Sequence, residues 1–144
     1  MNLITKHTDY AARALVYLAR SGGRLVPSRE IAEQEGIPLA FLRRILRELA
    51  QEGLIDTREG AAGGAKLAVD PRKIELTRLI EIYQGKISLV ECIFRRRLCP
   101  NRDHCVLRPR LMKIEELVLS ELAGITIGGL VKDIEEQNDE KKNN

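Results

Sequence analysis

The stretch from Ser28 to about Ala50 restricts the possible folds of this chain more than any other part of its sequence. A short helical pattern starts near Ser28 and ends at Gly36, and a longer pattern restarts at Ile37-Pro38-Leu39 and runs to about Ala50. The longer pattern is amphipathic, with Leu42, Ile45, Leu46 and Leu49 on one face and Arg43, Arg44 and Arg47 on the other. Two helices joined by a tight glycine turn, the second basic on its exposed face, predict a helix-turn-helix.

A glycine-rich stretch between two short apolar runs follows this motif. Residues 53–55 predict the start of one strand, and 67–69 predict a second. The glycines within 60–64 favour a hairpin, which we interpret as a wing whose backbone approaches DNA phosphates closely. Arg58 and Lys66, at the base of the wing, are expected to flank the minor groove. A nucleotide-binding loop is the competing interpretation, but the stretch lacks a terminal Gly-Lys-Ser/Thr and leads into a strand.

Two further helices are predicted around this unit. The first has Thr8 as a candidate N-cap and stops at residues 21–23, which read Ser-Gly-Gly. The second runs from about Glu75 to Tyr83 and is ended by Gly85. With these two helices the first 85 residues make a complete winged core.

An apolar stripe follows the last cysteine. Its spacing of three and four residues predicts a helix of about fifteen residues, and its members are Leu107, Leu111, Ile114, Val118 and Leu122. Because the core is already built, the stripe most economically packs on its copy in a second subunit, giving a two-fold dimer. A helix folded back on its own domain is the alternative. A DNA-binding dimer of this kind spans half-sites one helical turn apart, ~34 Å.

The predicted fold class is mainly α with a small β-hairpin wing. Thr126 is a candidate cap for a last short helix, and the polar residues from Asp133 onward are expected to be disordered. The predicted organisation is a winged helix-turn-helix DNA-binding domain at 1–85, a cysteine loop at 86–106, a dimerisation helix and short helix at 107–132, and a disordered tail at 133–144.

All three cysteines of the chain lie within fourteen residues, at Cys92, Cys99 and Cys105. An odd number of thiols disfavours a closed disulfide framework and favours a metal or redox role. The arginines at 95–97 and Arg102 favour the thiolate form, which is a good ligand for soft metals. Three ordinary, unligated cysteines are the alternative.

The charge distribution favours duplex DNA as a partner. Residues 1–112 contain 20 Lys and Arg against 13 Asp and Glu, whereas residues 113–144 contain 4 against 8. A basic body can contact phosphates. Aromatic residues make up only 3% of the chain, which leaves few rings to stack on unpaired bases and disfavours a single-strand or RNA binder.

Other classes of protein are disfavoured by missing patterns. The sequence has no charged-then-apolar N-terminal signal and no apolar run near the ~18 residues of a membrane span, so we expect a cytoplasmic protein with no membrane partner. It has no nucleotide motif and no Ser/His/Asp or Cys/His arrangement. We therefore expect neither an enzyme nor a small-molecule substrate.

The order of these parts resembles the Rrf-type bacterial transcription regulators, which include the iron–sulfur regulators IscR, NsrR and RirA. The three cysteines behind a winged helix are its most specific part. The resemblance rests on Thr8-Asp9-Tyr10-Ala11 with Arg13-Ala14-Leu15, Ile31-Ala32, Ile37 through Leu49, Gly63-Gly64, the three cysteines and Ile125-Thr126-Ile127. It implies an iron–sulfur cluster, 2Fe-2S or 4Fe-4S, bound once per subunit by Cys92, Cys99 and Cys105. Zinc is the runner-up, although structural zinc prefers cysteine pairs two to four residues apart.

The resemblance also bears on the fourth ligand. The IscR branch has a His three residues after the third cysteine, where this chain has Arg108. The NsrR branch uses an Asp in the first helix of the other subunit, and Asp9 of the partner subunit occupies the matching place. The competing role for this carboxylate is to favour the helix dipole from the first turn. His104 and His7 are weaker candidates.

The implied function is that of a dimeric DNA-binding transcriptional regulator, such as a repressor, whose operator binding is controlled by an iron–sulfur cluster sensing nitric oxide, redox state or iron and Fe–S status. In the family, base-reading positions include those of Ala40 and Arg43; because Ala40 cannot hydrogen-bond, readout is expected to move to Arg43 and Arg44. The full candidate DNA-binding set is Ser28, Pro38, Leu39, Ala40, Arg43, Arg44, Arg47, Arg58, Gly60, Gly63, Gly64 and Lys66. The alternative function is a cluster-free winged-helix regulator that uses its cysteines as a thiol redox switch or a zinc site.

Overall fold

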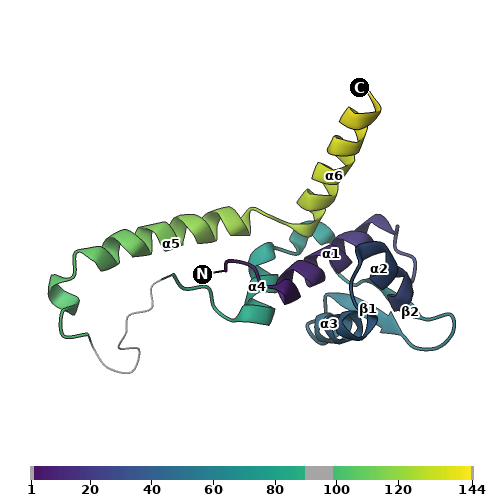
Figure 1. The fold of residues 1–144 in the computed structure, drawn as a ribbon, viewed down its shortest axis with the longest axis horizontal. Helices are drawn as coiled ribbons and strands as arrows, with labels where there is room; N and C mark the ends of the chain where they lie inside the picture. The colour runs from purple at the N-terminus through teal and green to yellow at the C-terminus, as the bar shows by residue number, and fades with distance from the viewer. Residues whose placement is uncertain (1, 90–98, 144) are drawn as a thin grey trace.

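The computed structural model describes residues 2–89 and 99–143 and confirms a mainly α-helical chain with a β-hairpin wing. Within these residues the elements are α1 (Lys6–Arg20), α2 (Ser28–Glu35), α3 (Leu39–Gln51), β1 (Ile55–Arg58), β2 (Gly64–Leu67), the 3-10 turn η1 (Pro71–Lys73), α4 (Leu76–Gln84), the 3-10 turn η2 (Arg102–His104), α5 (Leu107–Ala123) and α6 (Ile127–Lys142). Helices α1 to α4 and the hairpin gather into one body, from which α5 and α6 extend in different directions (Figure 1).

The predicted helix-turn-helix is confirmed. Helix α2 ends at Gly36, whose φ of 62° lies in the left-handed region that favours glycine, and α3 starts three residues later. On α3, four apolar side chains are buried and three arginines are exposed, in the two sets that the periodicity predicts. The buried face packs on α1 and α2, so the arginine face is left to solvent.

The wing is an antiparallel hairpin whose second strand differs from the predicted one. Strand β2 pairs with β1 from Ile55↔Leu67 to Arg58↔Gly64, so it ends where the strand predicted at 67–69 was expected to begin. The reason is a contact distant in sequence: Val26 exchanges two backbone hydrogen bonds of 2.8 Å with Ala65 and draws 64–67 onto the body.

Gly63 and Gly64 are required by the wing itself. A Cβ at Gly63 would overlap the Arg58 carbonyl across the hairpin, and one at Gly64 would overlap the Val26 carbonyl. Both glycines therefore permit close backbone packing inside the protein, which is a sufficient reason for their presence without any phosphate contact.

The start of α1 is joined to the end of α4, and this corrects the predicted cap. The helix begins at Lys6 with Thr5 in the capping position, whereas Thr8 is fully buried in its first turn. The Thr8 hydroxyl donates to Oε1 of Gln84 at 2.7 Å, and the Thr5 N–H donates to the same oxygen at 2.9 Å. Thr8 therefore serves a tertiary contact and not a cap.

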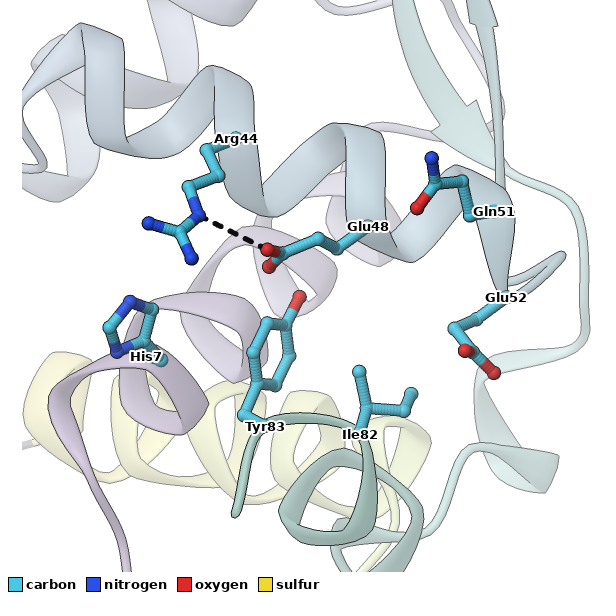
Figure 2. A pocket seen from close by; sticks show the side chains of 7 residues that line it. All are labelled: His7, Arg44, Glu48, Gln51, Glu52, Ile82 and Tyr83. Atoms are coloured by element: carbon cyan, nitrogen blue, oxygen red, sulfur yellow. Dashed lines mark hydrogen bonds and ion pairs between the residues drawn. The ribbon is translucent and has the colours of Figure 1, made fainter. Parts of the chain in front are cut away.

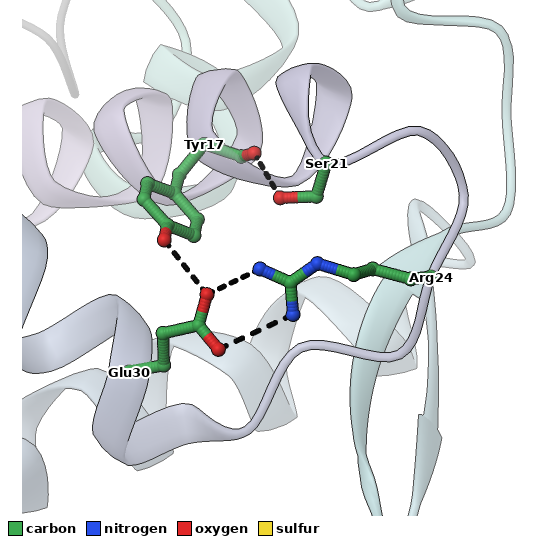
Figure 3. A network of polar contacts seen from close by, with 4 residues as sticks. All are labelled: Tyr17, Ser21, Arg24 and Glu30. Carbon is green, nitrogen blue, oxygen red and sulfur yellow. Dashed lines mark hydrogen bonds and ion pairs between the residues drawn. The ribbon is translucent and has the colours of Figure 1, made fainter.

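A polar network holds the loop between α1 and α2 (Figure 3). The Glu30 carboxylate accepts hydrogen bonds from the Arg24 guanidinium and from the Tyr17 hydroxyl, the latter at 2.8 Å. The Ser21 hydroxyl donates to the Tyr17 carbonyl at 2.7 Å. The bonds from Arg24 and then Tyr17 lower the pKa of Glu30, and the network fixes α2 relative to α1.

The C-terminal helices are anchored to the same body. The Leu76 N–H donates to the Ile125 carbonyl at 2.8 Å, and the Ile127 N–H donates to the Ile74 carbonyl at 2.9 Å. Leu122 and Ile127 are buried in the core, and α6 packs on α1.

The last helix is longer than the sequence predicted. The Thr126 hydroxyl caps α6 by accepting the Gly129 N–H at 3.0 Å, as expected. The helix then continues to Lys142, so the expectation of a disordered tail from Asp133 is wrong for residues 133–142. No helix in the described part of the chain is both long enough and apolar enough to cross a membrane.

Candidate DNA-binding face and cysteine site

A cleft of about 1020 Å³ separates the recognition helix α3 from the wing. It is lined by the start of α2, one side of α3 and the hairpin. Seven of the candidate DNA-binding residues line it, namely Ser28, Arg43, Arg47, Arg58, Gly60, Gly63 and Gly64. Residues from three separate elements thus meet at one concave surface.

The cleft is basic, with four arginines and one carboxylate, Glu59, among its lining residues. Four arginines line it, from α2, α3 and β1: Arg29, Arg43, Arg47 and Arg58. All four are exposed, and none makes a hydrogen bond or ion pair with a described residue. Unpaired guanidinium groups in a cleft of this size suit the phosphates and base edges of duplex DNA.

Arg29 is the cleft residue that the sequence analysis missed. It follows Ser28 in the first turn of α2, where a single arginine is indistinguishable from an ordinary solvated side chain. The fold places it in the cleft because the Val26 pairing with Ala65 brings the start of α2 against the wing.

Arg44 lies apart from the other α3 arginines. Its Nε donates to Glu48 at 3.2 Å, and it lines a smaller pocket of about 330 Å³ with His7 and Tyr83 (Figure 2). Burial, followed by the nearby Glu48 and Glu52 carboxylates, raises the pKa of Tyr83, so its hydroxyl stays protonated there. Because Arg44 pairs with Glu48 and lines this smaller pocket, it points away from the wing cleft.

The remaining DNA-binding candidates also lie outside the cleft. Pro38 occupies the N-cap position of α3, and Leu39 and Ala40 begin the helix. Leu39 is half-buried and packs on the core, whereas Ala40 is exposed. Lys66 is exposed on β2 opposite Asp56 of β1. The structure thus separates these residues and Arg44 from the seven that share one cleft.

The cysteine site is described in part. Cys99 and Cys105 are free thiols, both half-buried, and Cys92 lies outside the described residues. The Arg108 N–H, in the first turn of α5, donates to Cys105 Sγ at 3.4 Å. Among the described residues, no three His, Cys, Asp or Glu side chains lie close enough to hold a metal ion.

The candidate fourth ligands lie in different settings. Asp9 is in the first turn of α1, where its exposed carboxylate pairs with Arg13 at 3.5 Å. His104 is exposed in η2. The His7 ring packs against Phe41 with centroids 4.6 Å apart, as a half-buried aromatic contact. In this chain none of the three lies in a metal-binding group with the described cysteines.

The apolar stripe of α5 is divided between core and solvent. Leu122 is buried and Val118 packs against the core, so this end of the helix folds back on its own domain. Leu107 is 61% exposed, Ile114 is 50% exposed, and Leu111 is half-buried. The exposed surface is wider than the predicted stripe, because Val106, Met112 and Leu117 are also exposed.

The helix-turn-helix, the wing and the basic cleft between them define a winged-helix DNA-binding protein. Within that class, the chain belongs to the Rrf2 family of iron-dependent transcriptional regulators, whose family model matches residues 4–133. The chain is therefore a DNA-binding transcriptional regulator and not an enzyme, as the sequence predicts.

Individual relatives agree with this assignment. The chain is 35% identical to Protein aau3 of Rhizobium meliloti over 130 residues, covering 90% of this chain and 84% of that protein. It is 32% identical to the HTH-type transcriptional repressor NsrR of Streptomyces coelicolor, covering 89% and 87%. The fold is similar to that of CymR, the global cysteine regulator of B. subtilis, with a TM-score of 0.76, 23% identity, and coverage of 92% and 98%.

Proposed function

We propose that this chain is a dimeric repressor whose operator binding is controlled by an iron–sulfur cluster held in each subunit by Cys92, Cys99 and Cys105. The cluster would report nitric oxide, redox state or the supply of iron and Fe–S clusters. The observation that carries the proposal is the cysteine segment itself: in a member of a family described as iron-dependent, all the cysteines lie between α4 and the start of α5.

The sulfur atoms of Cys99 and Cys105 are suitable ligands for iron. Both are free thiols, and thiolates are the usual ligands of iron–sulfur clusters. The hydrogen bond from the Arg108 N–H holds Cys105 Sγ close to the start of α5. Hydrogen bonds of this kind to a ligating sulfur change the reduction potential of a cluster.

We propose Asp9 of the partner subunit as the fourth ligand. In this chain the Asp9 carboxylate is exposed, and its pairing with Arg13 is a long surface ion pair. Such pairs contribute ~0–1 kcal/mol, so the carboxylate can leave Arg13 for a metal at little cost.

The chain itself offers a route from the cysteines to the DNA-binding face. Cys105 lies at the start of α5, and the far end of that helix is buried and bridged to the start of α4. Helix α4 packs on α1, and α1 packs on α3. A bound cluster would supply a centre sensitive to redox state and nitric oxide at the N-terminal end of α5. In a two-fold dimer, a change in the α5 position alters the spacing of the two α3 helices, and typical coupling of ~1–3 kcal/mol changes affinity ~5- to 150-fold.

The test compares cluster-loaded with cluster-free protein on one operator across a salt titration, after anaerobic purification. We expect absorbance near about 400 nm in the loaded protein and a difference in operator affinity. Iron and sulfide are quantified on Cys→Ala variants of all three cysteines and on Asp9→Ala. Equal operator binding by the two forms would contradict cluster control.

A cluster-free regulator with a thiol switch or a zinc site is the second candidate. It is favoured by the partial exposure of Cys99 and Cys105, which leaves both thiols open to oxidation. A colourless protein that contains zinc or three free thiols after anaerobic purification would support it.

A further inference from the structure

Helix α5 is tied to the rest of the chain halfway along its length. Glu115, the ninth of its seventeen residues, accepts a hydrogen bond from the backbone N–H of Leu89 at 2.6 Å. The two residues are 26 positions apart, and the sequence between them contains all three cysteines. The bond therefore joins the chain that enters the cysteine segment to the helix that leaves it.

The bond lies where the core packing of α5 begins, although Leu117 beyond it is also exposed. After Glu115 the helix is held by core packing at Val118 and Leu122. Before it, apolar side chains such as Leu107 and Ile114 remain exposed. A hydrogen bond to a carboxylate is charge-assisted and stronger than a neutral one, so Glu115 extends the anchored part of α5 toward the cysteines.

We propose that Glu115 is a positioning residue that fixes the start of the cysteine segment relative to α5, whose first turn holds the Cys105 sulfur through the Arg108 N–H; this rests on the proposed cluster. Cys105 Sγ is bonded to the Arg108 N–H, so its position follows α5. Arg108 and Glu115 are seven residues apart, which is ~10 Å along a helix. The three residues from Leu89 to Cys92 also span at most ~10 Å. Chain length alone therefore keeps Cys92 about as close to the bond as the start of α5 is.

The effect on metal binding is entropic. Closing the segment at its base reduces the conformational freedom that the thiolates lose when they bind one centre together. Without the Glu115 bond, the first ligand separates more often from the other two. The metal is then released faster, with no change in the ligands themselves.

Three variants of the full-length protein test this role. Glu115→Leu removes the acceptor, and Glu115→Gln keeps an oxygen that can accept the Leu89 N–H. Glu116→Leu is the matched control, because Glu116 is the exposed neighbour on α5 and makes no hydrogen bond or ion pair with a described residue. Leu and Glu have similar helix propensities, so α5 is expected to form in all three.

Two rates are measured. In cluster-free protein, hydrogen exchange of the Leu89 amide is expected to be about five-fold faster in Glu115→Leu, equivalent to ~1 kcal/mol, a typical value for one hydrogen bond. In reconstituted protein, iron release to a chelator is expected to accelerate by a similar factor. Glu116→Leu is expected to match the unsubstituted protein in both measurements. Glu115→Gln keeps the acceptor oxygen but not its charge, and is expected to lie between Glu115→Leu and the unsubstituted protein.

The outcomes separate this inference from the proposed function. Iron release that is equally fast in Glu115→Leu and in the unsubstituted protein overturns the positioning role, as does equal acceleration in Glu116→Leu. If no form of the protein holds iron, the proposed cluster fails. The exchange of the Leu89 amide then still decides whether Glu115 holds the base of the segment, because unchanged protection in Glu115→Leu overturns that contact.

Discussion

The arginines of α3 are chemically alike, but the fold gives them different surroundings. Arg43 and Arg47 line the wing cleft without a described partner, whereas Arg44 points to Glu48 on another side of the helix. We expect Arg43→Ala and Arg47→Ala each to weaken operator binding by ~1–3 kcal/mol, or about 5- to 150-fold, the cost of losing one arginine contact to DNA. The measurement is an equilibrium titration of a labelled operator at fixed salt.

Arg44→Ala is the matched control for these two substitutions, because it removes the same charge from the same helix. We expect a smaller loss of affinity from it. A loss as large as that of Arg43→Ala would show that Arg44 leaves Glu48 when DNA binds. The exposed ion pair does not forbid this, since such i,i+4 pairs contribute only ~0.3–0.5 kcal/mol.

Asp70 makes the stability of the turn before α4 dependent on pH. The Arg72 side chain and then its backbone N–H, the latter at 2.9 Å, lower the pKa of Asp70 from 3.8 to about 2. A carboxyl whose pKa is lower in the folded state stabilises the fold above its unfolded pKa and loses that contribution as pH falls through the folded value. We expect Asp70→Asn to lower Tm above pH 3.8, and the difference to disappear as pH falls toward about 2.

The control for this prediction is Asp56→Asn, which removes an exposed carboxylate that makes no hydrogen bond or ion pair with a described residue. The difference in Tm between Asp70→Asn and the unsubstituted protein should also decrease in high salt, because the Asp70 side chain is partly exposed. A difference that stays constant from pH 5 to about 2 would assign the effect to packing and not to charge.

At the level of single residues, the sequence predicted the chemistry of the candidate site better than its geometry. The arginines, glycines and cysteines are visible in the sequence, but the direction of each side chain depends on neighbours brought by the fold. Glu48, four residues after Arg44, was the one sequence signal for the separation of that arginine. Arg29 had no signal, because its place in the cleft depends on the pairing of Val26 with Ala65.

Among the elements, the start of α6 packs closely against η1. A Cβ at Gly128 would lie 2.9–3.0 Å from the Arg72 backbone in η1, whereas a Cβ at Gly129 would meet only the Thr126 hydroxyl at 3.3 Å. We expect Gly128→Ala to lower the free energy of unfolding by ~1–3 kcal/mol, because added volume at a close contact forces the two elements apart. Urea denaturation of both alanine variants measures the effect.

Gly129→Ala is the control, as the adjacent substitution in the same helical turn. It adds the same methyl group and the same gain in helix propensity, ~1 kcal/mol. The expected order is that Gly128→Ala is clearly the less stable of the two. Equal stability would mean that η1 moves freely away from α6.

Local patterns predicted the elements well where a helix or turn depends on its own residues. The helix-turn-helix followed from apolar periodicity and Gly36, and α5 followed from its three-and-four spacing. The errors arose at residues whose structure depends on contacts with residues distant in the sequence. Thr8 bonds to Gln84, 76 residues away, and β2 is drawn onto Val26. The polar end of α6 has no apolar period to detect, although Lys132 and Glu136 form a helical i,i+4 pair at 3.5 Å.

For the whole molecule, the exposed part of α5 is the surface that a dimer would bury. Leu117 is 60% exposed and Ile114 is 50% exposed, on a helix whose other end already packs in the core. We expect Ile114→Glu and Leu117→Glu each to convert a dimer into monomers, because a carboxylate would be buried without a partner. Sedimentation equilibrium of the full-length protein measures the mass, and operator affinity should fall in parallel.

Lys113→Glu is the comparison for dimerisation, since it introduces the same carboxylate at another exposed position of α5. We expect it to leave the mass unchanged if residue 113 lies outside the interface. If the Leu117→Glu protein remains dimeric at micromolar concentration, the dimer interface lies elsewhere on the chain.

The bridge between residues 74–76 and 125–127 also determines when the protein can finish folding during its synthesis. Helix α1 leaves the ribosome before α6, but it packs on α6, and the core it shares includes Leu122 and Ile127. The nascent winged helix therefore exposes part of its apolar surface until about fifty further residues have been added after α4. A ribosome that stops within the cysteine segment would release a chain with an unfinished core, which is a substrate for proteolysis and not a stable DNA-binding fragment.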